Sequence, residues 1–340
     1  MNAPDASLLE AQSVARTLVG APVDLRRLPL SGRNSRIYQV HAGERVFALK
    51  QYPSRRDDPR DRLSTEVGAL RLMELCSVND VPRVVGVDPQ HGYALLTWID
   101  GSEVGELGDA DVDAAIAFLM AVHGLRREPG AASQPRAAEA CLAGIEIERQ
   151  VEARLALLRS LKVEKELIDF LDNLFAPELA RRTAQARAQA YAAGLDFAAD
   201  LPQEWWSLVP ADFGFHNSLR RGDGSLAFVD FEYFGWDDPV KLTADILLHP
   251  GRPLLPPQGR RFRAAAERLY GEDPLFARRL AAYLPMFGLR WVLILLNEFL
   301  PERWQRRVLA GDTASWNDAK VRQLNRARDF LAALPQKVDA

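Results

Sequence analysis

Short runs of apolar residues, separated by turn-forming residues, fill most of the first hundred positions of the chain. The run Val46-Phe-Ala-Leu49 has the length and composition of a β-strand, and the Ala42-Gly43 turn before it predicts a β-hairpin over residues 36–51. Helical spacing predicts helices over residues 6–19 and 61–73. The predicted strands are residues 25–30, 36–41, 45–51, 83–88 and 92–98.

Beyond Gly101 the pattern changes to the periodicity of amphipathic helices, apart from hairpins predicted over residues 207–232. The longest helical stretch covers residues 130–206. Its apolar residues recur at roughly helical spacing, and two or three long helices are the simplest interpretation. These apolar residues include Leu142, Ile145, Leu155 and Leu158.

The most apolar window of the chain, residues 281–300, is interrupted by a proline and by charged residues, among them Pro285, Arg290 and Glu298. A charged residue at the centre of a bilayer costs about 2.5 to 3.5 kcal/mol, which makes this window a poor membrane span. We therefore expect no membrane span, and a buried core helix in which Arg290 reaches a carboxylate.

The composition is that of a globular protein with one large or two smaller cores, since 48% of the 340 residues are hydrophobic and 26% are charged. A net charge of −3 argues against nucleic acid as a partner. Cys76 and Cys141 lack the spacing of a zinc site, and the first residues do not resemble a signal peptide. A cytoplasmic location is therefore predicted.

Three polar residues form the strongest chemical pattern. Asn217 follows Asp212 by five positions, and Asp230 follows the strand-like run 225–229. In kinase-type phosphotransferases the first carboxylate of such a set orients the acceptor hydroxyl, while the asparagine oxygen and the second carboxylate hold Mg²⁺. A hard cation prefers oxygen ligands, which these residues supply. The alternative interpretation is two acidic loop residues and a turn asparagine.

Asp212-Phe-Gly214 has the letters of the metal-binding triplet of protein kinases, but its place in the chain differs. Because Asn217 lies downstream of Asp212, Asp212 takes the position of the catalytic carboxylate. Asp230, in the segment 228–232, then takes the position of the metal-binding carboxylate.

Lys50 is the only lysine in the first 161 residues of a chain with six lysines and 37 arginines. Its compact ammonium fits between two phosphates, and kinases place such a lysine on the third strand in a sequence of type V-A-I-K. Glu66, early in the next predicted helix, is its expected partner. The alternatives are a surface lysine at a strand end and, for Glu66, a carboxylate that favours the helix dipole.

A turn rich in small polar residues, residues 30–35, precedes the predicted hairpin. Its backbone N–H groups could form a nest for phosphate, although it lacks the repeated glycines of protein kinases. The nest residues are Ser31, Gly32, Asn34 and Ser35.

Together these features resemble the aminoglycoside phosphotransferase and choline kinase-like family, a small-molecule branch of the protein-kinase-like fold. The resemblance extends from about residue 28 to about residue 250. One departure is Pro210, which stands where the family usually has a histidine two residues before the catalytic aspartate. Five segments resemble family motifs: 93–101 the hinge, 119–125 the L-x-x-L-H-x-L helix, 210–217 the catalytic H-G-D-x-x-x-x-N, 229–232 the I-D-[FW]-E, and 235–239 the G-D-P turn.

The resemblance implies an α+β, two-lobed protein-kinase-like fold. A small, mixed β-sheet N-lobe would span residues 1–98, and a large, mainly helical C-lobe would span residues 99–340. The C-lobe would hold the catalytic loop, the metal segment and a helical insertion at about residues 130–206. In this family such an insertion forms the acceptor-binding wall; a structural or dimerising hairpin is the alternative.

The resemblance also implies an activity: the γ-phosphoryl group of ATP moves to a hydroxyl of a small molecule, such as a sugar, an amino sugar or an amino alcohol. Asp212, Asn217, Asp230 and Lys50 would be catalytic, with Mg²⁺ on Asn217 and Asp230. The nucleotide would contact Lys50, Glu66, Ser31, Gly32, Asn34 and Ser35, and the backbone at Trp98 and Ile99.

The acidic residues Glu232, Asp237 and Asp238 would suit a cationic acceptor. Two alternatives to a small-molecule kinase stay open, namely a nucleotide-binding pseudokinase scaffold and a protein kinase. The second is disfavoured because the turn at 235–239 follows Asp230 at once, with no activation segment between them.

Overall fold

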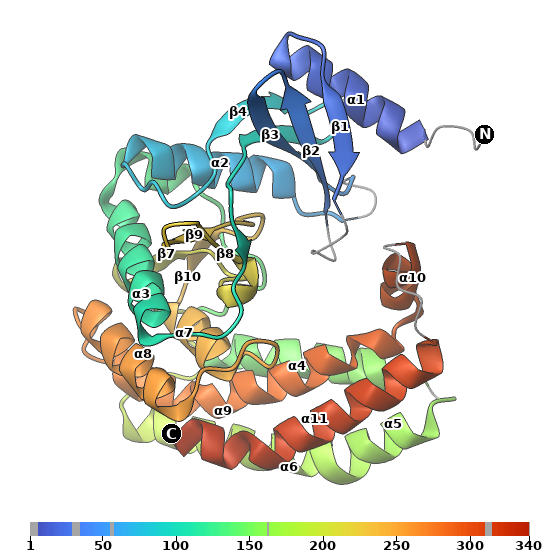
Figure 1. Ribbon diagram of the computed structural model, residues 1–340. Coiled ribbons are helices and arrows are strands. Elements are labelled where there is room, and N and C mark those ends of the chain that lie inside the picture. The colour runs from blue at the N-terminus through green and yellow to red at the C-terminus, as the bar shows by residue number, and fades with distance from the viewer. Residues whose placement is uncertain (1–5, 29–34, 55–57, 162, 310–314, 340) are drawn as a thin grey trace. The chain divides into compact units, whose positions relative to one another are not determined.

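The computed structural model describes residues 6–28, 35–54, 58–161, 163–309 and 315–339 (Figure 1). The chain divides into two compact units, each assembled from separate stretches of sequence. The first unit comprises Met1–Glu106, Ala121–Ala138 and Pro210–Gly235, and the second comprises Leu107–Met120, Glu139–Val209 and Trp236–Ala340. The lobe boundary at residue 98 stays a prediction.

A five-stranded sheet with strand order β1-β2-β3-β5-β4 forms the centre of the first unit. All of its strand pairs are antiparallel. The strands are β1 (Asp24–Arg27), β2 (Arg36–Ala42), β3 (Arg45–Gln51), β4 (Val84–Asp88) and β5 (Tyr93–Thr97).

The predicted hairpin over residues 36–51 is formed by β2 and β3, which join through Gly43 at a φ of +64° that suits glycine. One face of the sheet buries Val40 and Leu49 fully against helix α1 (Ala6–Val19). Because successive side chains of a strand point to opposite faces, Lys50 projects from the other face.

Helix α2 (Arg62–Leu75) begins after Asp61, whose carboxylate accepts a hydrogen bond from Ser64 N at 3.1 Å. Val67 and Leu70 are buried, in agreement with the predicted apolar face. The helix contacts β4 and β5, and this packing fixes it against the sheet.

A three-stranded sheet with strand order β6-β8-β9 also belongs to the first unit, and residues 210–235 supply two of its strands. Its strands are β6 (Ser102–Glu103), β8 (Ser218–Arg220) and β9 (Leu226–Phe228). Beyond the β8–β9 hairpin, Val229 N donates to Asn217 O at 2.9 Å. Asn217 and Asp230 therefore lie at the same end of the hairpin.

Helices build the second unit around α9 (Phe276–Leu295), which packs against α4, α6, α7 and α11. The predicted helical stretch holds α4 (Gly144–Arg159), α5 (Lys165–Phe170) and α6 (Ala176–Ala192), with a wider helical turn over Leu171–Phe175. The remaining helices are α3 (Asp109–Gly124), which runs from this unit into the first, α7 (Pro239–Leu248), α8 (Pro256–Leu269), α10 (Pro301–Leu309) and α11 (Trp316–Asp339).

Shorter elements complete the described chain. β7 (Ser207–Val209) pairs with β10 (Gly235–Asp237), whose residues Trp236 and Asp237 belong to the second unit. Short 3₁₀ turns cover Leu125–Arg127, Pro129–Ser133, Gln203–Trp205, Phe215–Asn217 and Leu296–Phe299. The α+β class expected from the sequence is confirmed by the sheets of the first unit and the helices of the second.

Among the described residues, one helical run, Phe276–Phe299, is long and apolar enough to cross a membrane. It is weak evidence for a span, because 78% of its most apolar window is buried inside the protein, as in a core helix. Arg290 lies 3.2 Å from Asp245 Oδ1 and 2.6 Å from Glu139 Oε2. The expectation that Arg290 reaches a carboxylate is therefore confirmed.

Candidate active site

Lys50 lies near the end of β3 and is almost fully buried, with 4% of its surface exposed. Its Nζ atom is 2.6 Å from Glu66 Oε2 and 2.6 Å from Asp230 Oδ1. Burial disfavours the charged ammonium, but the carboxylates of Asp230 and Glu66 outweigh it and hold the pKa of Lys50 well above its usual value. The structure thus joins Lys50 to its expected partner and excludes a surface position for it.

Glu66 is the residue that ties three elements of the first unit together. Its Oε2 atom accepts a hydrogen bond from Tyr52 Oη at 2.8 Å as well as from Lys50, and its Oε1 atom accepts one from Phe231 N at 3.2 Å. With 1% of its surface exposed, it is not a solvated carboxylate at a helix end. Its contacts link β3, α2 and the segment after β9.

Asp230 has a backbone φ of +70°, a conformation that is unfavourable for residues other than glycine. Such strain costs about 1 to 3 kcal/mol and concentrates at functional sites. Burial raises the pKa of Asp230 to about 7, and Glu232 and Glu66 act in the same direction while Lys50 opposes them. Its side chain still has 29% of its surface exposed, so this carboxylate is accessible to a ligand.

Asp212 follows a tight turn in which its N–H donates to Pro210 O at 2.7 Å and Ala211 has a φ of +52°. This turn forms although Pro210 stands at the position where the resembled family usually has a histidine. The Asp212 side chain is 42% exposed, and its Oδ1 atom lies 3.4 Å from His216 Nε2. A Cβ atom on Gly214 would lie 2.8 Å from His216 Nδ1, so glycine makes room for this imidazole.

Asn217 is connected to both acidic residues of the pattern. Its Nδ2 atom donates to Asp212 O at 2.8 Å, and its backbone oxygen accepts the bond from Val229 beside Asp230. The side-chain bond uses the amide nitrogen, whereas a cation would need the amide oxygen. The hairpin therefore brings together the three residues on which the sequence pattern rests.

Glu232 lies two residues beyond Asp230 and is held by Arg62, which the sequence-based set does not contain, and by Ser35, which it does contain. Arg62 Nη1 donates to Glu232 Oε1 at 2.7 Å, and Ser35 Oγ donates to Glu232 Oε2 at 2.8 Å. Arg62 precedes Glu66 by one helical turn, so the helical spacing is the signal that could have placed it near the site.

The remaining predicted nucleotide contacts are only partly described. Ser31, Gly32 and Asn34 lie outside the described residues, and Ser35 is held by Glu232. Trp98 and Ile99 follow β5 directly, and Trp98 Nε1 donates to Asp100 Oδ1 at 2.8 Å. Lys50 pairs with Ala94 on the same β5 strand, which places the ammonium and the predicted hinge on neighbouring strands.

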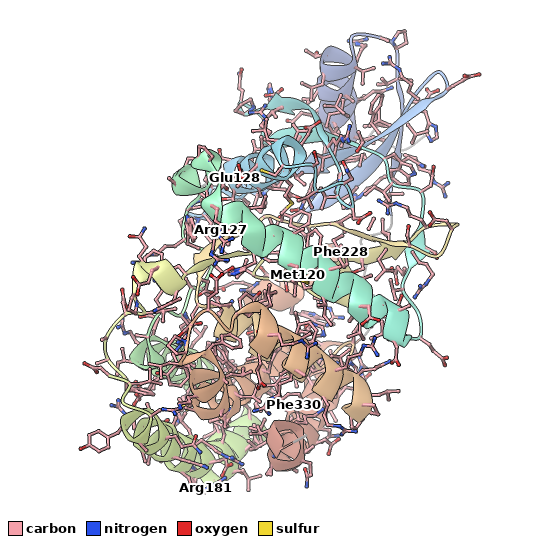
Figure 2. The ribbon with its side chains drawn as sticks, turned by 90° about the vertical axis from the view of Figure 1, so that its left-hand side faces the viewer. Met120, Arg127, Glu128, Arg181, Phe228 and Phe330 are labelled. Carbon is pink, nitrogen blue, oxygen red and sulfur yellow. The ribbon has the colours of Figure 1, made fainter. Side chains whose placement is uncertain are left out.

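Carboxylate oxygens of Glu66, Asp230 and Glu232 lie within 4.8 Å of one another, close enough to hold a metal ion. An all-oxygen set of this kind suits a hard cation such as Mg²⁺. Glu66 and Glu232 are buried, whereas Asp230 is partly exposed. Figure 2 labels Phe228, the last residue of β9, which precedes Asp230 by two positions. The Lys50 ammonium, the accessible carboxylates of Asp212 and Asp230, and the Asn217 amide therefore gather at one end of the β8–β9 hairpin.

Solved structures share this fold over nearly the whole chain. Choline kinase from Cryptosporidium parvum Iowa II is 10% identical with a TM-score of 0.60, and 98% of this chain aligns with 96% of that one. Choline kinase from Streptococcus pneumoniae is 14% identical with a TM-score of 0.57, over 97% of this chain and all (100%) of that one. Spectinomycin phosphotransferase in complex with ADP and spectinomycin is 10% identical with a TM-score of 0.60, over 98% of both chains.

Likeness at this level of identity establishes a two-lobed kinase-like fold, as expected from the sequence. No curated protein matches the chain by sequence. The sequence model of the phosphotransferase enzyme family, APH, matches residues 24–280, which is more than half of the chain. The protein therefore belongs to the APH phosphotransferase enzyme family.

Proposed function

We propose that this small-molecule phosphotransferase transfers the γ-phosphoryl group of ATP to a hydroxyl of its acceptor. The observation that carries the proposal is the contact of Lys50 with both Glu66 and Asp230, at 2.6 Å each. Asp230 is 180 residues from Lys50 in the chain, so the fold assembles this group from distant segments. Membership of the family indicates the class of reaction, and the contacts within the site support the choice of residues.

In the proposed reaction Lys50 binds the α- and β-phosphates and Glu66 keeps the ammonium in place. Asp212 orients the acceptor hydroxyl. The hydroxyl oxygen forms a bond to the γ-phosphorus while the bond from that phosphorus to the bridging oxygen breaks, and ADP leaves. Asp212 accepts the hydroxyl proton. Most of the rate enhancement in such a transfer comes from positioning and charge neutralisation, which fixed side chains provide.

The donor chemistry of the site fits Mg²⁺. Asp230 offers an accessible carboxylate oxygen, and Asn217 offers an amide oxygen at the same end of the hairpin. We assign these two residues to the metal. Bound there, Mg²⁺ would supply positive charge to the phosphate oxygens. The strained backbone of Asp230 supports this assignment, because such strain is retained where a side chain must point in one direction.

The raised pKa of Asp230 predicts a pH dependence of metal binding. Because this pKa is about 7 in the folded protein, well above the ordinary value of 3.8, a proton competes with the cation below neutral pH. We expect the rise in melting temperature caused by Mg²⁺ with ADP to be smaller at pH 6 than at pH 8, and to recover when a sample at pH 6 is returned to pH 8. Thermal unfolding at both pH values measures this rise, and the same experiment with ADP alone is the control. Equal Mg²⁺-dependent shifts at both pH values would contradict the prediction.

The acceptor is assigned only to a class, a sugar, an amino sugar or an amino alcohol. The choline kinases and the spectinomycin-bound enzyme of similar fold support a small acceptor. The acidic residues Glu232, Asp237 and Asp238 give no particular support to a cationic one, because each has partners inside its own unit. Asp238 pairs with Arg279 at 2.9 Å, and Asp237 Oδ1 accepts hydrogen bonds from Cys141 N and Asp238 N.

A protein substrate is disfavoured by the chain after Asp230. β10 begins at Gly235, and Asp238 caps α7, which starts at Pro239. This leaves no room for an activation segment between Asp230 and α7. The short connection supports a small acceptor.

The test is thermal unfolding of the protein with Mg²⁺ and either ATP or GTP. A ligand at 100 times its Kd adds about 2.7 kcal/mol to the free energy of unfolding, which raises the Tm by a few degrees. We expect a Mg²⁺-dependent rise that is lost in Asp230→Asn and kept in Asp223→Asn. Asp223 is an exposed acid in the turn of the same hairpin, which makes it the matched control. No rise with either nucleotide would count against the proposed function.

A further inference from the structure

A buried ion triad lies beside the proposed phosphate-binding lysine. Arg62 Nη1 donates to Glu232 Oε1 at 2.7 Å, and Arg62 Nη2 donates to Asp58 Oδ2. The side chains of Arg62 and Glu232 expose 2% and 0% of their surface, and that of Asp58 exposes 7%. A buried ion pair is weak evidence for stability, because apolar packing of the same shape often stabilises a protein as well or better.

The second oxygen of Glu232 faces the proposed active site. Glu232 Oε2 lies 3.5 Å from Lys50 Nζ, and Asp230 Oδ1 lies 2.6 Å from the same atom. Two carboxylates that are separated by one residue in sequence therefore compete for one ammonium. With Glu66 they also form the trio whose oxygens could hold a metal ion.

The proposed reaction needs Asp230 and Lys50 to be available to the cation and the phosphates. Glu232 is the third carboxylate near Lys50. Without a cationic partner of its own it would attract Lys50 and repel the phosphate groups. Arg62 prevents this by neutralising Glu232 through Oε1, whereas the contact with Lys50 involves Oε2. An arginine suits the position because its planar fork contacts Asp58 and Glu232 at once, which an ammonium cannot do with the same geometry.

We propose that Arg62 is a positioning residue of the phosphotransferase site. By neutralising Glu232, which lies 3.5 Å from Lys50 Nζ, it weakens the attraction of that carboxylate for Lys50 and leaves Asp230 as the carboxylate that serves the cation. Arg62 and Glu66 stand one turn apart on α2, and Glu66 accepts the hydrogen bond from Phe231 N. One helix thus fixes the segment after β9 at two successive residues. This inference rests on the proposed function.

Titration calorimetry with ADP in excess Mg²⁺ tests the proposal. We expect Arg62→Gln to weaken ADP binding by about tenfold or more, because the freed carboxylate of Glu232 draws Lys50 away. Adding Glu232→Gln to this variant removes the competing charge and should restore binding to within about threefold of wild type. Arg60→Gln is the matched control, since Arg60 also pairs with Asp58 but is 41% exposed.

Removing both partners would also repair a purely structural pair, so the melting curves separate the two roles. Positioning predicts that Arg62→Gln loses about tenfold in ADP affinity at a temperature at which its melting curve shows it to be fully folded. The melting temperature of each variant shows whether it is folded. If Arg62→Gln does not fold, Arg62→Met takes its place, because methionine removes the charge and keeps an unbranched side chain, with the same expected loss and restoration. Wild-type affinity in the single variant, or no restoration in a folded double variant, would overturn the proposal. No ADP binding by wild type would instead count against the proposed function.

Discussion

Replacing Asp230 with asparagine is expected to lower turnover by about a thousandfold or more while the protein stays folded. The substitution keeps the size of the side chain and removes the negative charge that would bind the cation. It also removes the carboxylate that lies 2.6 Å from Lys50. Because 29% of the side chain is exposed and its neighbours carry further carboxylates, the loss of charge should not unfold the site.

Steady-state kinetics at saturating ATP measures this loss once an acceptor has been found by screening sugars, amino sugars and amino alcohols. Asp223→Asn serves again as the control, because it removes an acid from the same hairpin at its exposed turn. A rate within tenfold of wild type in Asp230→Asn would show that the carboxylate is not needed, and the metal assignment would then be abandoned.

Replacing Asp212 with asparagine should lower kcat by about a hundredfold to ten-thousandfold, the usual contribution of a positioned acid or base. The KM for ATP should stay close to wild type, since Lys50, Glu66 and Asp230 are untouched. The two substitutions therefore have different signatures: Asp230→Asn impairs nucleotide and metal binding as well as turnover, and Asp212→Asn impairs turnover alone.

The side chain of Asp212 is 42% exposed, so its replacement should leave the Tm nearly unchanged. Thermal shifts with Mg²⁺ and ATP should also match those of wild type. An unchanged kcat in Asp212→Asn would exclude this residue as the group that orients the hydroxyl. A lost thermal shift would assign it to nucleotide binding instead.

The site residues that could be predicted from the sequence are those for which the proposed chemistry allows few residue types. A single lysine among the many arginines of the first 161 residues, and an asparagine between two aspartates, restrict the possibilities because phosphate and Mg²⁺ demand these groups. The expected pair of Lys50 with Glu66 is present in the structure, because a strand followed by a helix brings residues of this spacing together.

Arg62 could not be predicted in the same way. It is one of 37 arginines, and its partner Glu232 lies 170 residues further along the chain. The pairing depends on where α2 packs, and that is decided by tertiary contacts and not by local pattern. Tyr52 was missed for a similar reason, since its hydroxyl contact with Glu66 depends on how the chain turns after β3.

Helices in the second unit were predictable from periodicity, but their irregularities were not. The expected long helices over residues 130–206 are present as α4, α5 and α6. The wider turn over Leu171–Phe175, between α5 and α6, leaves no mark in the apolar pattern, because Leu171 and Phe175 are both buried, as in a regular helix. The role of this stretch as an acceptor-binding wall stays a prediction.

If Lys50 binds phosphate as proposed, its contact with Asp230 in the ligand-free protein would compete with the nucleotide. Free ATP would have to break this ion pair and strand Asp230 beside the negative charge of Glu66 and Glu232. ATP that binds together with a cation would give Asp230 a new counter-ion when Lys50 moves to the phosphates. Nucleotide and cation must then raise each other's affinity by the same factor, as thermodynamic linkage requires. On the proposed function, the ligand-free site would therefore disfavour nucleotide that lacks its metal.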